Sequence, residues 1–385
     1  MRIAVPAETD PGETRVAATP ETVRKFLALE AQISVQRHAG REAGFPDDEF
    51  EAAGATIAPD AATACSGADL ILKVRRPSLT DLAAFRPGAL IVAIMDPYGH
   101  EAAIEAMARA GVDAFAMELM PRITRAQAMD VLSSQANLAG YRAVIDAAAE
   151  YGRALPMMMT AAGTVPAARI FIMGVGVAGL QAIATARRLG AIVTATDVRP
   201  ATKEQVESLG AKFIAVEDEE FRQAETAGGY AKEMSSEYQA KQAALVAAHI
   251  AKQDIVVTTA LIPGRPAPRL ISAEMVRAMR PGSVIVDLAV ERGGNCELSA
   301  AGEKIIAGNG VSIVGYSNVT RLAATASSLY ARNLYAFVET LIDKETRTLA
   351  PKWDDELVRA TLLTREGAVV HPNFQAANPQ SIPAA

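Results

Sequence analysis

Residues 120–142 hold an unusually dense group of short hydrogen-bonding side chains in a chain that is 50% hydrophobic. Four of them, separated by five, three and three residues, combine a guanidinium, an amide, a carboxylate and a hydroxyl: Arg122, Gln127, Asp130 and Ser133. Such a set offers both hydrogen-bond donors and acceptors, which holding a carboxamide in one orientation requires. A carboxamide is the polar group of a nicotinamide ring. The alternative is a helix-capping segment followed by a solvated helix face, and the spacing alone leaves both interpretations open.

The segment 169–197 has the residues that a dinucleotide-binding loop needs. The motif "GVGVAG" follows the apolar run "RIFIM" and opens a helical pattern. Gly174 allows a tight turn, Gly176 lets the backbone approach a pyrophosphate, and Gly179 lets helix and strand pack closely. Val177 begins the helix, whose free N–H groups favour phosphate. The alternatives are a glycine-rich turn without a ligand, and FAD or another adenosine ligand.

The next apolar run ends in Asp197, 23 residues after the first glycine (197 − 174). A carboxylate here accepts hydrogen bonds from the adenosine ribose and repels a 2′-phosphate, which predicts NAD(H) rather than NADP(H). Val198 and Arg199 complete this part of the predicted site, although an arginine can also pair with a phosphate. Leu261 ends the run "DIVVTTAL" and is expected to form part of the wall on the adenosine side, because ligands lie beyond the carboxyl ends of parallel strands.

Short apolar runs alternate with helical patterns in two blocks, which is typical of parallel sheets covered on both faces. The runs are "RIAV", "QISVQ", "ADLILKV", "ALIVAIM" and "VDAFAM", then "ARIFIMG", "AIVTATD", "AKFIAV", "DIVVTTAL", "SVIVDLAV" and "VSIVGYS". We predict an α/β fold of two doubly wound, Rossmann-like domains with parallel sheets, joined by long helices near 131–152 and 325–344. The first domain is expected at 1–130 plus 328–385, because the C-terminal residues should return to it. The second, nucleotide-binding domain is expected at 131–327.

Composition excludes several classes of protein. The net charge is −6 and the basic residues are dispersed, which is a poor footprint for nucleic acid. No apolar stretch is long enough to span a bilayer, and "MRIAVPAETD" lacks the features of a signal peptide. Cys65 and Cys296 are expected to be reduced thiols in the cytoplasm, and the histidines lack the spacing of metal ligands, so no metal is expected. The run Met157-Met158-Met159 is interpreted as soft packing at the domain junction.

Several longer segments are similar to those of one enzyme family. "MPRITRAQAMD" with "LSSQANLAGYRAV", "GVGVAGLQAIATARRLGA", "TKEQVESLGA", "GGYAKEM" and "TTALIPGRPAP" closely resemble the NAD(H)-binding component of proton-translocating nicotinamide nucleotide transhydrogenase, within the alanine dehydrogenase/transhydrogenase superfamily. The resemblance covers nearly the whole chain. It implies direct hydride transfer from NADH to NADP⁺, coupled to proton movement through a membrane subunit.

The resemblance also implies roles for individual residues. Arg122, Gln127 and Asp130 would form the loop that places the nicotinamide, with Ser133 beside it. Tyr230 would lie at the tip of a mobile loop that closes over bound nucleotide. The polar insert at about 217–242 fits that role independently, with Gly228-Gly229 as a hinge before the aromatic residue, although a surface helical hairpin is the alternative.

The partners implied by the resemblance are a second copy in a homodimer, an NADP(H)-binding subunit and a membrane proton-channel subunit. The sequence shows one dinucleotide fingerprint, so the NADP(H) site and the channel are expected on other polypeptides. The chain itself is expected to be cytoplasmic and peripheral on the cytoplasmic face of the inner membrane, through those subunits. Because no proton is exchanged at carbon, its task is to position the reacting ring.

Alanine dehydrogenase resembles the same two-domain fold and is the main alternative. Arg15 and Lys73 stand where that family holds its substrate carboxylate and carbonyl. The strand end that carries the family's histidine has Asp96 here, with His100 several residues late, and Glu291 replaces the catalytic aspartate. Without a placed imidazole, proton transfer to the substrate oxygen has no agent. We therefore expect Arg15 and Lys73 to be structural ion-pair or hydrogen-bond partners. An NAD-responsive regulatory module without hydride transfer is a third hypothesis.

Overall fold

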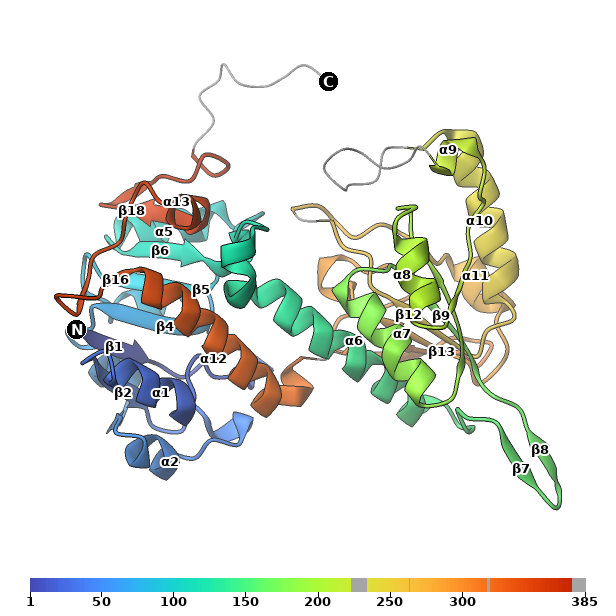
Figure 1. Ribbon diagram of the computed structural model, residues 1–385, viewed down its shortest axis with the longest axis horizontal. Helices are drawn as coiled ribbons and strands as arrows, with labels where there is room; N and C mark the ends of the chain where they lie inside the picture. The colour runs from blue at the N-terminus through green and yellow to red at the C-terminus, as the bar shows by residue number, and fades with distance from the viewer. Residues whose placement is uncertain (223–233, 263, 317–318, 376–385) are drawn as a thin grey trace. The chain divides into compact units, whose positions relative to one another are not determined.

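The computed structural model describes residues 1–222, 234–262, 264–316 and 319–375. The chain divides into two units, Met1–Gln135 with Thr320–Ala385, and Ala136–Val319 (Figure 1). We call them unit 1 and unit 2. The boundaries therefore fall after 135 and 319, where the sequence placed them after 130 and 327. Within the described residues, no helix is long and apolar enough to cross a membrane.

Unit 1 is built on an eight-stranded sheet whose order is β19-β18-β6-β5-β4-β1-β2-β3. Strands β1 to β6 are parallel, and β18 joins β6 in the antiparallel direction. Their bounds are β1 (Arg2–Val5), β2 (Gln32–Gln36), β3 (Thr56–Ala58), β4 (Leu70–Arg75), β5 (Leu90–Ile94), β6 (Asp113–Ala116), β18 (Leu362–Arg365) and β19 (Ala368–Val369). The central strands are buried along nearly their whole length, as their uninterrupted apolar runs predict.

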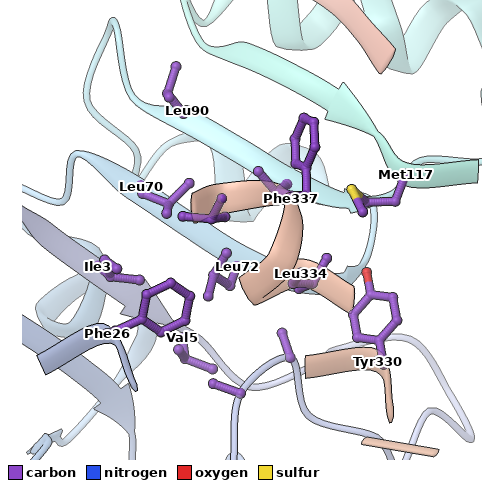
Figure 2. Close-up of a cluster of buried hydrophobic side chains, with 14 of the residues drawn as sticks. Ile3, Val5, Phe26, Leu70, Leu72, Leu90, Met117, Tyr330, Leu334 and Phe337 are labelled. Carbon is purple, nitrogen blue, oxygen red and sulfur yellow. The ribbon is translucent and has the colours of Figure 1, made fainter. Parts of the chain in front are cut away.

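Helices cover this sheet, and the C-terminal residues return to it as predicted. The helices are α1 (Pro20–Leu27), α2 (Asp47–Ala52), α3 (Ala61–Cys65), α4 (Leu79–Leu82), α5 (Glu101–Arg109), α12 (Ala323–Thr340) and α13 (Glu356–Thr361), with 3₁₀ turns η1 (Arg41–Ala43), η2 (Met117–Leu119), η3 (Thr124–Met129) and η5 (Thr320–Leu322) and a small hairpin β16 (Ile342–Asp343) and β17 (Thr348–Leu349). Helix α12 lies wholly in unit 1 rather than joining the two units. Its buried Tyr330, Leu334 and Phe337 belong to the same core as Ile3 and Leu72, as Figure 2 shows.

Unit 2 has a seven-stranded sheet in the order β11-β10-β9-β12-β13-β15-β14, parallel except for the edge strand β14. The strands are β9 (Arg169–Met173), β10 (Ile192–Thr196), β11 (Lys212–Phe213), β12 (Ile255–Thr258), β13 (Val284–Asp287), β14 (Lys304–Ile306) and β15 (Ser312–Val314). Its helices are α7 (Val177–Arg188), α8 (Thr202–Ser208), α9 (Glu219–Arg222), α10 (Ser236–Ile250) and α11 (Ala273–Ala278), with the turn η4 (Val290–Arg292). Helix α6 (Val131–Glu150) begins in unit 1 and continues in unit 2.

Both parallel sheets follow one topology. Numbered along the chain within each unit, the six parallel strands have the order 3-2-1-4-5-6, which is that of the doubly wound Rossmann fold. The strand order reverses between β1 and β4 in unit 1 and between β9 and β12 in unit 2. The predicted fold class is confirmed, and the topology identifies the carboxyl ends of these strand pairs as the places where a ligand would bind.

One interpretation from the sequence is wrong. The methionines at 157–159 are all exposed, with 80% of Met159 accessible, so they are not packed inside the protein. They begin a two-stranded antiparallel hairpin, β7 (Met158–Thr160) and β8 (Gly163–Val165) (Figure 1). Hydrophobic composition predicts burial only where another element covers the segment, and this hairpin pairs with no other strand in the described structure.

Candidate functional site

Two glycines of the phosphate loop are required by the fold itself. Gly174 adopts φ +101°, a backbone conformation that side-chain-bearing residues avoid, and it turns the chain out of β9. A Cβ built on Gly179 would lie 1.9 Å from the carbonyl oxygen of Gly174. No larger residue fits there without moving backbone, so helix α7 packs directly against the loop.

Gly176 differs from both, because the fold does not require it to be glycine. It has φ −80° and a Cβ added to it would meet no atom within 4 Å. It is the N-cap residue of α7, and no side chain caps that helix. Free backbone N–H groups at a helix start, approached through open space, suit a phosphate. The glycine is therefore explained by a ligand that approaches the backbone rather than by packing.

Asp197 lies just beyond β10 with its carboxylate largely buried. Its Oδ2 accepts a hydrogen bond from the backbone N–H of Val175 at 2.7 Å, which ties it to the phosphate loop. Its Oδ1 accepts one from the backbone N–H of Arg199 at 2.9 Å. The Arg199 guanidinium donates to both oxygens, from Nε at 2.9 Å and from Nη2 at 3.1 Å. The predicted acceptor for the ribose is thus in place, with an arginine folded onto it.

Exposed aliphatic side chains lie at the same edge of the unit 2 sheet. Val177, Val198, Leu261 and Ile262 each follow the carboxyl end of β9, β10 or β12, and between 40% and 57% of each is accessible. An adenine ring has two flat apolar faces, so such side chains suit it. Sequence reasoning named the first three and missed Ile262, although its position next to Leu261 was a usable signal.

Two residues that the sequence did not single out fix this edge. Asn295 accepts from the backbone N–H of Ala260 at 3.0 Å and donates to its carbonyl oxygen at 2.9 Å, which holds the loop that carries Leu261. Thr259 donates from Oγ1 to the carbonyl oxygen of Gly174 at 3.0 Å. Both contacts join residues that are distant in sequence, so no local pattern could have predicted them.

The polar segment in unit 1 contains residues of two kinds. Asp130 caps the start of α6, since its Oδ1 accepts from the Ser133 backbone N–H at 2.9 Å and its Oδ2 accepts from the Ser133 hydroxyl at 2.6 Å. Ser134 donates to Asn333 of α12 at 2.7 Å, and Gln135 is buried. The capping interpretation therefore describes some of the segment correctly.

Arg122 and Gln127 belong to the other kind. Both are exposed, and neither side chain has a hydrogen-bond or ion-pair partner among the described residues. Arg125, between them in sequence, is paired with Asp355 through two bonds of 2.9 and 3.0 Å. Of the cluster, Arg122 and Gln127 keep their hydrogen-bonding groups available to a ligand. Gly229 and Tyr230, predicted for the closing loop, lie outside the described residues.

The carboxyl ends of β1 and β4 in unit 1 are occupied by buried charges. Lys73 is 1% exposed, with Nζ 3.6 Å from Glu8 Oε2 and 3.5 Å from Asp81 Oδ2. Burial raises the pKa of the Glu8 carboxyl, and the positive charge of Lys73 opposes that shift.

Arg15 is equally committed, because it donates to Glu13 at 2.6 Å and to the Gln135 side chain at 2.9 Å. Burial acts to raise the pKa of Glu13, but the hydrogen bonds and charge of Arg15 outweigh it, so the pKa is lowered. The prediction that Arg15 and Lys73 are structural partners is confirmed. His100 is the N-cap residue of α5, with Nδ1 2.9 Å from the carbonyl oxygen of Asp96.

Together these features define a two-unit α/β protein with a Rossmann-type dinucleotide site in unit 2. Comparison with known families is in agreement. The model described as "Alanine dehydrogenase/PNT, N-terminal domain" matches residues 4–139, and "Alanine dehydrogenase/PNT, C-terminal domain" matches residues 143–372. The chain belongs to this family, which confirms the resemblance seen in its sequence.

Individual relatives separate the two branches of the family. The chain is 57% identical over 378 residues to the first of the polypeptides that make up the NAD(P) transhydrogenase alpha subunit of Rhodospirillum rubrum, covering 97% of this chain and 98% of the relative. A solved structure of transhydrogenase from Sinorhizobium meliloti is 62% identical, with a TM-score of 0.88 over 96% of this chain and all of that one (100%). Alanine dehydrogenase of Halomonas elongata is 30% identical, covering 96% of this chain and 95% of that relative.

Proposed function

We propose that this chain is the NAD(H)-binding subunit of an NAD(P) transhydrogenase, which transfers hydride directly between NADH and NADP⁺ held on a partner subunit. The observation that carries the proposal is the uncapped start of α7 behind Gly176, with the Asp197 carboxylate linked to the same loop. High identity to transhydrogenase alpha subunits over nearly their whole length supports the choice of reaction.

The roles follow from the chemistry of each group. The backbone N–H groups at the start of α7 bind the pyrophosphate, Asp197 accepts from the adenosine ribose, and the aliphatic side chains at 177, 198, 261 and 262 contact the adenine. The free side chains of Arg122 and Gln127 bond the carboxamide of the nicotinamide. Asp130 and Ser133 act on that ring by holding the chain that follows Gln127.

Bound NADH supplies the hydride, and the protein supplies orientation. Hydride transfer between two nicotinamide rings exchanges no proton at carbon, so no general acid or base is needed. Direct transfer requires the two reacting carbons roughly 3–3.5 Å apart, which makes ring placement the main contribution of the protein.

The alternative, an alanine dehydrogenase, finds no support in unit 1. Arg15 and Lys73 already pair with carboxylates of the chain itself. A substrate carboxylate would have to displace buried partners from both residues. The His100 ring, bonded to the Asp96 carbonyl, starts a helix rather than ending a strand.

The partners proposed are an NADP(H)-binding subunit, a membrane proton-channel subunit and a second copy of this chain, with the complex at the cytoplasmic face of the inner membrane. The relatives are named as alpha subunits, which supports the first two. The exposed methionines of the β7–β8 hairpin support the homodimer, because exposed apolar side chains beside unpaired strand edges favour pairing with another chain. Light scattering of a variant with Met157, Met158 and Met159 all changed to Ser should show a monomer, and an unchanged dimer would refute this contact.

The reaction is tested by following NADH oxidation with the purified chain under two conditions. With an NADP⁺-loaded partner subunit, NADPH should form at the rate at which NADH disappears. With pyruvate and ammonia, no NADH should be consumed. Oxidation in the second mixture would reverse the ranking of the two activities, whereas NADH binding without oxidation in either would favour a regulatory module.

A further inference from the structure

The carboxylate of Asp197 has no free acceptor position. A carboxylate offers about four lone-pair positions. Here two are taken by the backbone N–H groups of Val175 and Arg199, and the other two by Nε and Nη2 of the Arg199 guanidinium. The same guanidinium also donates to the carbonyl oxygen of Val175 at 3.2 Å, so it bridges Asp197 and the phosphate loop.

A ribose that binds Asp197 must therefore displace a donor. The two backbone donors are fixed by the β9–α7 turn and the β10–α8 turn, whereas the Arg199 side chain is about one-third exposed and can rotate away. The guanidinium is the group that the ribose hydroxyls replace. Arg199 and the ribose thus compete for the same two acceptor positions.

We infer that Arg199 is a specificity-determining residue, held by Asp197 so that it competes with the ribose and cannot bind a 2′-phosphate. The inference rests on the proposed binding of NAD(H) by unit 2. An arginine near the ribose is the usual partner of a 2′-phosphate. A 2′-phosphate carries no donor that could replace the guanidinium on Asp197, and the carboxylate repels it. Asp197 then excludes NADP(H) in two ways, by its own charge and by retaining the cation that would otherwise attract it.

The first test is Arg199→Met, which keeps the aliphatic stem and removes the donors. Titration calorimetry of the full chain with NADH should show binding that is tighter by about three- to ten-fold, the range expected when a partly exposed ion pair is removed as a competitor. Arg188→Met, which removes an exposed positive charge from α7, should leave the affinity unchanged. Equal or weaker NADH binding by Arg199→Met would overturn the inference.

The second test compares Asp197→Asn with the double variant Asp197→Asn/Arg199→Met, using NADPH. Releasing Arg199 should make NADPH bind at least about ten-fold more tightly than to the unaltered chain, because a guanidinium–phosphate pair is charge-assisted. The double variant should lose that gain. If both variants bind NADPH equally, Asp197 acts by charge alone and the role of Arg199 is refuted. If the unaltered chain binds no NADH, the proposed function itself fails, which is a different result.

Discussion

Units 1 and 2 have the same order of parallel strands but opposite contents at the point where that order reverses. In unit 2, β9 leads into α7 through three residues, 174–176, and the start of the helix has neither a side-chain cap nor an acidic residue in its first turn. In unit 1, β1 leads into α1 through residues 6–19. There Thr19 forms a capping box with Thr22, and Glu21 lies in the first turn.

The difference shows that this topology provides a location and not a function. Parallel strands and helix dipoles create a favourable place for an anion in both sheets. In unit 1 the chain fills that place with its own charges, Lys73 with Glu8 and Asp81, and Arg15 with Glu13. In unit 2 glycines keep the backbone bare. Substitutions in each unit test this contrast, from the largest expected effect to the smallest.

Removing the buried cation of unit 1 should cost the most stability. Lys73→Met leaves Glu8 and Asp81 without their counter-charge, and breaking a buried pair in this way costs about 3–5 kcal/mol. Urea unfolding measures the loss, and Lys25→Met, at an exposed pair, should change the free energy of unfolding by less than about 1 kcal/mol.

The pH dependence of Lys73→Met has a definite sign. Burial raises the pKa of Glu8, and without Lys73 the pKa rises further. A raised carboxyl pKa favours the folded state at low pH, and this contribution is lost as pH increases through the folded-state pKa. The variant should therefore be less destabilised at pH 4 than at pH 8. The opposite order would show that Glu8 is not the group left without a partner.

Gly179→Ala should destabilise unit 2 through a backbone clash. The added Cβ would lie 1.9 Å from the Gly174 oxygen, which side-chain rotation cannot relieve. Overpacking of this kind costs about 3 kcal/mol or more in the free energy of unfolding. Thermal unfolding by circular dichroism checks it, and a stability equal to that of the unaltered chain would mean that the close packing is not needed.

Gly176→Ala should separate binding from folding. Nothing in the protein lies within 4 Å of the added methyl group, so the free energy of unfolding should change by no more than about 1 kcal/mol. NADH should nonetheless bind at least about ten-fold more weakly, because the methyl group stands where the pyrophosphate approaches the backbone. Unchanged affinity would remove the main argument for a phosphate site at this turn.

Gln127→Asn tests the free donors of unit 1. The shortened amide should slow hydride transfer about ten-fold, equivalent to one well-placed hydrogen bond, while the dissociation constant of NADH changes much less. Stopped-flow transfer at saturating NADH measures the first and calorimetry the second. Gln205→Asn, at another exposed glutamine, is the control. A large loss of affinity with normal transfer would contradict the positioning role.

The smallest effect concerns the acidic first turn of α1. Hydrogen bonds from Arg332 and Lys25 lower the pKa of Glu21 from 4.5 to about 2. A lowered carboxyl pKa stabilises the fold above the unfolded-state value, and this contribution is lost as pH falls from about 4.5 towards 2. Because the pair is exposed, Glu21→Gln should cost no more than about 1 kcal/mol at pH 7 and nothing below pH 2. Unfolding curves across this pH range would reveal any other pattern.

The amino-acid sequence alone determined the fold class, the order of the long strands and the phosphate loop. Runs such as "RIAV" and "RIFIM" carry their strand signal locally, and Gly174 and Gly179 occupy positions whose backbone geometry follows from the motif. The short edge strands, such as β3 and β14, were missed because two or three residues contain too little periodicity.

Only the tertiary structure decided which polar groups remain available. Gln135 accepts from Arg15, 120 residues away, and Ser134 bonds Asn333, 199 residues away, whereas Gln127 has no such partner among the described residues. The four bonds on Asp197 likewise depend on how one arginine folds back. A residue's type states which bonds it can form, but the chain brings its partner to it from a distance, and local sequence carries no record of that.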